Sequence, residues 1–124
     1  MPLPKEQNQR ELHLLIVEDE TIVAMDLEDI LSDLGHEVLG VAATLNQALR
    51  FIEERAANID AVVLDANLAG VSSAPVAEAL RQHQIPYIVA SGYGSEELRA
   101  QGLDGPMVGK PYEIHEIEAS LLNI

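Results

Sequence analysis

The chain contains no cysteine, which excludes disulfide bonds and thiolate metal sites. It also lacks any apolar run close to the roughly 20 residues that a membrane-spanning helix needs. Its first eleven residues are polar with two prolines, and they lack the basic start and apolar stretch of a secretory signal. We therefore expect a flexible tail at residues 1–11 and a cytoplasmic location.

Basic residues are scarce, since 7 Lys and Arg stand against 21 Asp and Glu and give a net charge of −14. This charge repels the phosphates of nucleic acids and anionic lipids, so neither is an expected partner. It could attract divalent cations or a basic protein surface, or it could simply keep the protein soluble. The 124 residues, 48% of them hydrophobic, suffice for one domain, which we place at residues 12–124.

Five short apolar runs are candidate strands, because continuous runs of this length are typical of strands buried on both faces of a parallel sheet. They are residues 12–17, 38–43, 61–64, 87–90 and 107–108. Helical patterns lie between and after them, at residues 21–34, 46–56, 73–84, 92–101 and 112–122. Three have expected end signals: Gly35 as a stop, Thr44 or Asn46 as a cap, and Pro75 in a first turn.

The alternation of strand and helix predicts an α/β fold with a five-stranded parallel sheet and five helices on its two faces. The weakest helix is 92–101, which starts with two glycines and has only Leu98 as an apolar anchor. No internal repeat or linker is evident, and we expect no output domain on this chain.

Binding sites in open α/β sheets form beyond the carboxyl ends of the strands. The polar residues that directly follow the apolar runs are Glu18, Asp19, Asp65, Ser91 and Lys110. Converging carboxylates resist ionisation, and Mg²⁺ removes this conflict because it prefers carboxylate oxygens. The lysine and serine can bind phosphoryl oxygens, so the set matches the charge neutralisation that phosphoryl transfer requires.

Four segments, IVEDE, VVLDANLAG, IVASGYG and VGKPY, resemble the signature segments of the response-regulator receiver family and occur in the family's order. The resemblance covers roughly residues 12–122 and implies a flavodoxin-like fold with strand order 2-1-3-4-5. It implies that Asp65 is the phosphoacceptor and that Glu18 and Asp19 hold Mg²⁺, with Asp19 as a direct ligand. The backbone carbonyl of Asn67 would complete the metal ligands together with Asp65.

The resemblance also implies that Ser91 and Lys110 bind the phosphoryl group and that the Lys110–Pro111 bond is cis. One position departs from the family pattern: the aromatic switch residue three positions before the lysine is Met107 here. The SGYG segment resembles a FATGUY-like subgroup of the family, which makes Tyr93 of this chain a candidate substitute switch or lid. An exposed loop tyrosine is the alternative for Tyr93.

Each candidate residue also has an ordinary structural explanation. Asp19 could cap a helix, Glu18 could favour a helix start, and Ser91 could begin a turn. Asp65 could be a loop aspartate and Lys110 a surface charge. The histidines at 13, 36, 83 and 115 show no metal-ligand spacing, and we interpret them as structural or surface residues.

Two other functions fit the sequence less well. A phosphatase with an aspartyl-phosphate intermediate would carry D-x-D near the first strand, whereas D65-A-N follows the third. A dinucleotide site fails because G92-Y-G-S-E-E lacks the third glycine. The remaining alternative is a phosphorylation-independent, receiver-like interaction module, which would normally have lost Asp65 or Lys110.

The sequence therefore predicts a single-domain response regulator that accepts a phosphoryl group on Asp65 from a histidine kinase or phosphotransfer protein, with Mg²⁺ as cofactor. It would signal through contact with an unknown downstream protein or act as a phosphate sink. We expect no enzyme activity beyond its own phosphotransfer and slow autodephosphorylation, and a monomer or weak dimer.

Overall fold

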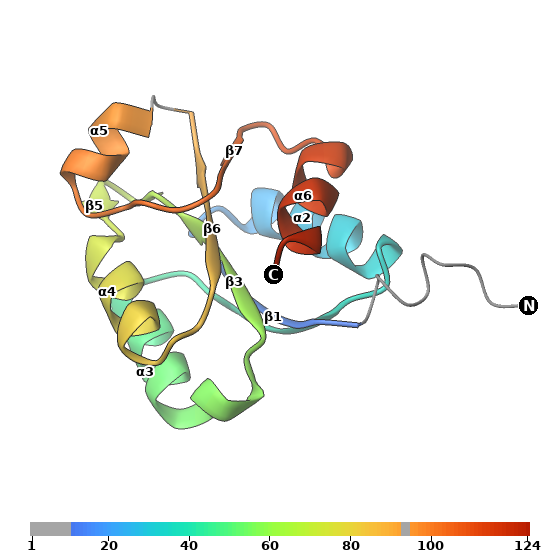
Figure 1. The fold of residues 1–124 in the computed structure, drawn as a ribbon, viewed down its shortest axis with the longest axis horizontal. Helices are drawn as coiled ribbons and strands as arrows, with labels where there is room; N and C mark the ends of the chain where they lie inside the picture. Colours follow the sequence, from blue (N-terminus) through green and yellow to red (C-terminus); the bar gives the residue numbers. More distant parts are fainter. Residues whose placement is uncertain (1–10, 93–94) are drawn as a thin grey trace, which may run out of the picture.

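Five parallel strands form the central sheet of the computed structural model, which describes residues 11–92 and 95–124 (Figure 1). The strands are β1 His13–Val17, β2 Glu37–Ala42, β3 Ala61–Asp65, β6 Tyr87–Ser91 and β7 Met107–Gly109. Their order is β2-β1-β3-β6-β7. Residues 1–10 of the predicted tail, which spans 1–11, and the switch candidate Tyr93 lie outside the described residues.

The predicted sheet is confirmed, with one correction of detail. A two-stranded hairpin that we did not predict, formed by β4 Asn67–Leu68 and β5 Val71–Ser72, takes two places in the strand numbering. The predicted order 2-1-3-4-5 therefore reads β2-β1-β3-β6-β7. The hairpin was missed because its strands have only two residues each, too few for a periodic pattern.

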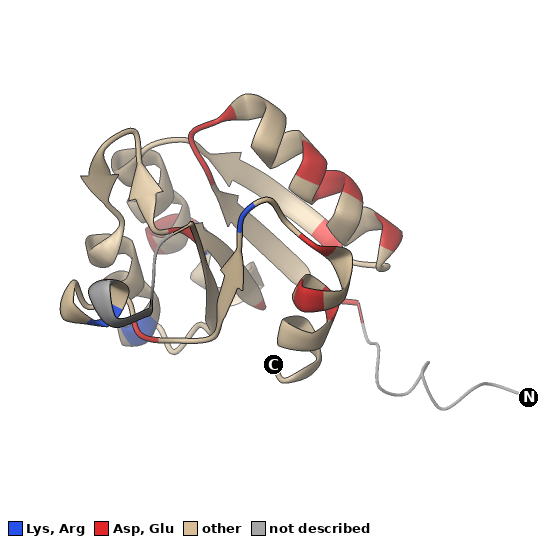
Figure 2. Ribbon diagram, turned by 90° about the horizontal axis from the view of Figure 1, so that it is seen from above, with Lys and Arg blue, Asp and Glu red and all other residues tan. Residues whose placement is uncertain are grey.

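Helices cover both faces of the sheet (Figure 1). They are α2 Thr21–Asp33, α3 Leu45–Arg55, α4 Ala74–Gln82, α5 Ser95–Ala100 and α6 Ile114–Leu122, with a 3₁₀ turn at Ala56–Asn58. No helix in these ranges is long and apolar enough to cross a membrane. Figure 2 shows acidic segments spaced along α2, which contributes four of the aspartates and glutamates.

The core is divided in two by the sheet, because successive side chains of a strand point to opposite faces. Leu15 and Val17 of β1 pack with residues of α3, α4 and α5. Leu14 and Ile16 pack with residues of α2 and α6 on the other face. The three central strands β1, β3 and β6 are buried almost throughout, which explains why they have continuous apolar sequences.

The helix ends follow the sequence signals. Gly35, at φ +91°, ends α2 by donating its N–H to Ser32, while the next N–H reaches Leu31. Thr44 caps α3 by accepting the Gln47 N–H at 3.1 Å. Pro75 stands in the first turn of α4.

Candidate phosphoacceptor and metal site

Three carboxylates meet at the carboxyl edge of the sheet. Val17 of β1 lies beside Leu64 of β3, so Glu18 and Asp65, the next residues on each strand, are brought together. Carboxylate oxygens of Glu18, Asp19 and Asp65 lie within 4.8 Å of one another. Glu18 is 1% exposed and Asp65 5% exposed, whereas Asp19 is half-buried. The three acids that the sequence placed at this edge therefore form one group.

The cation of the site is Lys110, which follows β7. Its Nζ lies 2.9 Å from Glu18 Oε1 and 2.9 Å from Asp65 Oδ2. The bond between Lys110 and Pro111 is cis, as the family resemblance implied. One ammonium group thus bridges two buried carboxylates, which matches the offsetting role predicted for this lysine.

Burial and this lysine act in opposite directions on the two acids. Burial raises the pKa of Asp65 to about 6, against the lowering effect of the hydrogen bond from Lys110. Burial also opposes ionisation of Glu18, but the hydrogen bonds it accepts, first from Lys110, bring its pKa below the ordinary value. In the metal-free site, Asp65 is the acid that more readily retains a proton.

Asp65 faces a pocket of about 190 Å³, large enough for a small anion and water. Its walls are Glu20, Asp65, Ala66, Asn67, Ser91, Gly92 and Lys110. Ser91 is 7% exposed and lies beside Gly109 in the sheet, the neighbour of the lysine. The phosphoacceptor, serine and lysine predicted from the sequence therefore share one cavity.

Asn67 is held beside Asp65, the predicted phosphoacceptor, by the β4–β5 hairpin. Its backbone N–H donates to Asp65 Oδ1 at 3.2 Å, and its side-chain Oδ1 accepts the Gly70 N–H at 2.7 Å. Ala69 and Gly70 both have positive φ, 52° and 89°, the backbone form of a tight hairpin turn. The role of the Asn67 carbonyl as a metal ligand stays a prediction.

The acidic group fits Mg²⁺ in its chemistry. It offers hard oxygen donors, with Asp65 lining the pocket, and a hard cation would relieve the repulsion between the carboxylates. The competing explanation of Asp19 as a helix cap does not hold, because Glu20 occupies the N-cap of α2 and makes no side-chain cap bond.

Two residues of the site were missed from the sequence. Glu20 lines the pocket, and the Tyr112 hydroxyl donates to Glu18 Oε1 at 3.4 Å. The order E-D-E and the position of Tyr112 two residues after Lys110 were the available signals. The spacing of apolar residues places Tyr112 at the start of the helix expected at 112–122, and this spacing indicates no hydrogen-bond partner for its hydroxyl.

Met107, the residue in place of the aromatic switch, is partly buried. It belongs to β7, pairs with Val89 and packs against the core on the side of α3 and α4. An apolar side chain at this place has no hydroxyl or ring edge to offer the serine. Met107 is one of the two switch candidates, and we predict that its rotamer changes less on activation than the 92–101 segment does.

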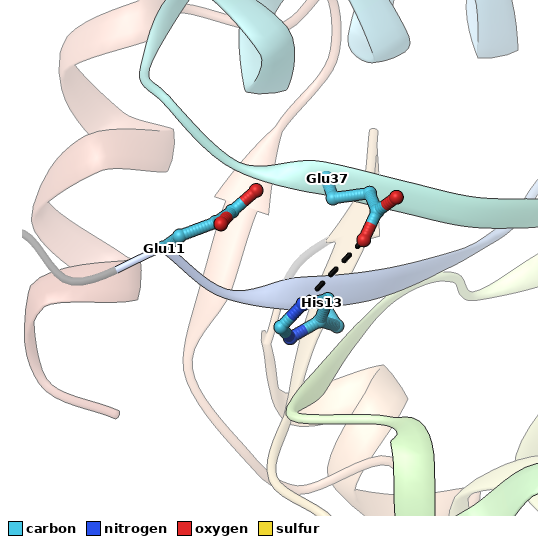
Figure 3. A group of neighbouring side chains, drawn as sticks. All are labelled: Glu11, His13 and Glu37. Atoms are coloured by element: carbon cyan, nitrogen blue, oxygen red, sulfur yellow. Dashed lines mark ion pairs between the residues drawn. The ribbon is translucent and has the colours of Figure 1, made fainter.

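A second group of titratable residues lies at the opposite edge of the sheet (Figure 3). His13 begins β1 and pairs with Glu37 at the start of β2. The His13 Nε2 atom lies 3.4 Å from Glu37 Oε1, and Nδ1 lies 2.9 Å from Asp60 Oδ2, with Glu11 nearby. The hydrogen bond to Asp60 is the main cause of a raised His13 pKa. We interpret this group as ion pairs that stabilise the packing of neighbouring strands at their first residues.

Comparison with known proteins identifies the family. The model of the response regulator receiver domain matches residues 14–121, which include every candidate site residue. The chain therefore belongs to the response regulator receiver family of two-component signalling.

Individual relatives agree with this assignment. The phyllosphere-induced regulator PhyR of Methylorubrum extorquens is 31% identical over 109 residues, covering 86% of this chain and 40% of PhyR. The solution structure of SdrG from Sphingomonas melonis Fr1 is 37% identical with a TM-score of 0.78, covering 92% of this chain and 98% of SdrG. The BeF3-activated conformation of SdrG, attributed to Pseudomonas melonis Fr1, is 38% identical with a TM-score of 0.74, covering 89% and 95%. The chain thus spans less than half of PhyR and nearly all of SdrG.

Proposed function

We propose that this protein is a phosphorylation-activated response regulator that accepts a phosphoryl group on Asp65. One observation supports this above all: a buried carboxylate faces a small pocket, 2.9 Å from Lys110 Nζ and within one acidic group with Glu18 and Asp19. A receiver-like module without phosphotransfer would not need this set, which holds three like charges together at a cost in stability.

The donor would be a phosphohistidine of a histidine kinase or phosphotransfer protein. An Asp65 oxygen attacks phosphorus in line, an acyl phosphate bond forms, and the P–N bond breaks, leaving the electron pair on the imidazole, which then takes up a proton. Mg²⁺, held by Glu18, Asp19, Asp65 and the Asn67 carbonyl, would neutralise charge on the transferring group. Lys110 and Ser91 would donate hydrogen bonds to the phosphoryl oxygens in the product.

Phosphorylation would change the surface formed by the segment after β6. Ser91 ends β6, so its movement toward a phosphoryl group would pull on the chain leading to α5. Such a change would bind or release an unknown protein, or the chain would act as a phosphate sink in the cytoplasm. Apart from phosphotransfer and slow hydrolysis of its own acyl phosphate, we propose no enzyme activity.

The relatives add support for this cycle. SdrG has a structure described as a BeF3-activated conformation, and this chain covers 95% of it. Beryllofluoride occupies the place of a phosphoryl group, so activation by the same anion is the behaviour we expect of this protein.

The test is the intact mass after incubation with acetyl phosphate and MgCl₂. Wild type should gain one phosphoryl group, and the gain should require Mg²⁺ and disappear in Asp65→Asn. Asp33→Asn, which removes an exposed charge at the end of α2, is the matched control and should behave as wild type. Because small donors can fail where a kinase succeeds, a phosphorylated phosphotransfer protein is the second donor. No gain from either, with Mg²⁺ bound, would favour the phosphorylation-independent module.

A further inference from the structure

Tyr112 lies between the phosphoacceptor site and the core. It stands in the loop between β7 and α6, and its ring packs against the core cluster on the α2 and α6 face. Its hydroxyl reaches the acidic group and donates to Glu18 Oε1 at 3.4 Å. Burial first, and then the charge of Glu18, strongly raise the Tyr112 pKa, so the hydroxyl keeps its proton and acts as a donor.

Besides its hydrogen bond with the neighbouring Asp65 carboxyl group, the Glu18 carboxylate contacts three donors. Its Oε2 accepts the backbone N–H of Glu20 at 3.2 Å, while Oε1 faces Lys110 Nζ at 2.9 Å and the Tyr112 hydroxyl. A carboxylate as buried as this one depends on such donors, because a buried charge without partners is costly. The lysine also contacts Asp65, whereas the Tyr112 hydroxyl donates to Glu18.

Lys110 contacts both Glu18 and Asp65, and this becomes important when Asp65 is phosphorylated. In the proposed function, Lys110 binds the phosphoryl group on Asp65, which draws its ammonium away from Glu18. The tyrosine hydroxyl is neutral and fixed by the packed ring, so it has no reason to follow. It would remain the side-chain donor that keeps the Glu18 carboxylate in place.

We propose that Tyr112 is a positioning residue of the acidic site: its hydroxyl orients Glu18 toward the bound Mg²⁺ and keeps it oriented when Lys110 turns to the phosphoryl group. This inference rests on the proposed function. It adds a connection from the metal site to α6, because the same side chain contacts both.

Tyr112→Phe tests the proposal, since it removes the hydroxyl and keeps the ring. Titration with MgCl₂ by calorimetry should show a dissociation constant about threefold to tenfold weaker than wild type, the range expected for one ordinary hydrogen bond. The loss should be greater when beryllofluoride is present with MgCl₂. Tyr87→Phe is the matched control: its hydroxyl bonds Arg81 and Asp104 at the far end of β6, and Mg²⁺ affinity should be unchanged.

A double-mutant cycle separates positioning from general destabilisation. If the hydroxyl acts through Glu18, then Tyr112→Phe should have little further effect on Mg²⁺ affinity in a Glu18→Gln background. Wild-type Mg²⁺ affinity in Tyr112→Phe, with and without beryllofluoride, would overturn the inference, as would an equal loss in both backgrounds. Neither result touches the proposed function, which fails separately if wild-type Asp65 gains no phosphoryl group from either donor.

Discussion

At the scale of single residues, the central feature is that Asp65 is buried in an acidic group, with Lys110 as its neighbouring cation. Burial raises the pKa of Asp65 to about 6, from a value of 3.8 in an unfolded chain. The folded state therefore binds a proton on Asp65 more tightly than the unfolded state does. Folding stability due to this group is highest below pH about 4 and falls as the pH rises through about 6.

The first prediction concerns Asp65→Asn in the absence of Mg²⁺. The variant has no such titration, so it should become more stable than wild type as the pH rises from 4.5 to 7.5. We expect a gain of about 1 to 2 kcal/mol at pH 7.5, below the full value of the pKa shift because the amide loses a charged partner in Lys110. Urea unfolding with EDTA at both pH values measures it. A difference that stays constant, or that favours wild type at pH 7.5, contradicts the prediction.

At the scale of elements, the ends of helices and the short hairpin place the site residues. The turn at Gly35 sends the chain from α2 into β2 with two hydrogen bonds that replace those of the helix. The β4–β5 hairpin brings the Asn67 N–H to Asp65. Both turns depend on residues at positive φ, where most side chains are strained.

Gly35→Ala should therefore lower the free energy of unfolding by about 1 kcal/mol, from backbone strain at φ +91°. A Cβ at Gly35 would meet no atom within 4 Å, so crowding adds nothing. Gly35→Asn should cost less, because asparagine adopts this conformation more readily. Urea unfolding of the two variants checks the order. Equal losses would point to a cause other than backbone conformation.

At the scale of the whole molecule, the acidic charge favours cation binding. The net charge is −14, and three of the acids meet at one edge of the sheet. A cation that binds the folded site and not the unfolded chain stabilises the fold in proportion to its occupancy. Exposed acids elsewhere attract Mg²⁺ only weakly, since salt screens them.

Mg²⁺ should therefore stabilise wild type by about 2 to 3 kcal/mol at roughly 100 times the dissociation constant. Thermal unfolding at fixed ionic strength, with NaCl in the reference sample, measures this gain. Asp19→Asn should lose most of it. Glu53→Gln, which removes one exposed charge on α3, should retain it. Equal stabilisation of all three proteins would indicate a general charge effect and no defined site.

The sequence by itself determined the fold class, the five strands and the edge of the sheet where the polar residues gather. Strand and helix periods are local properties, and the position of Asp65 or Lys110 after an apolar run can be read directly along the chain. The family resemblance then supplied roles for these residues. The prediction that the polar residues gather at one place required only that parallel strands end at the same edge of the sheet.

The tertiary structure decided which atoms meet. Lys110 Nζ contacts both Glu18 and Asp65 because of the register of β1, β3 and β7 and because of the side-chain conformations. The spacing of apolar residues along the chain specifies neither. The Tyr112 hydroxyl was hidden for the same reason, because its partner lies 94 positions earlier in the chain. The hairpin beside Asn67 was too short to leave a pattern. Such contacts arise from packing between distant segments, so only the folded chain specifies them.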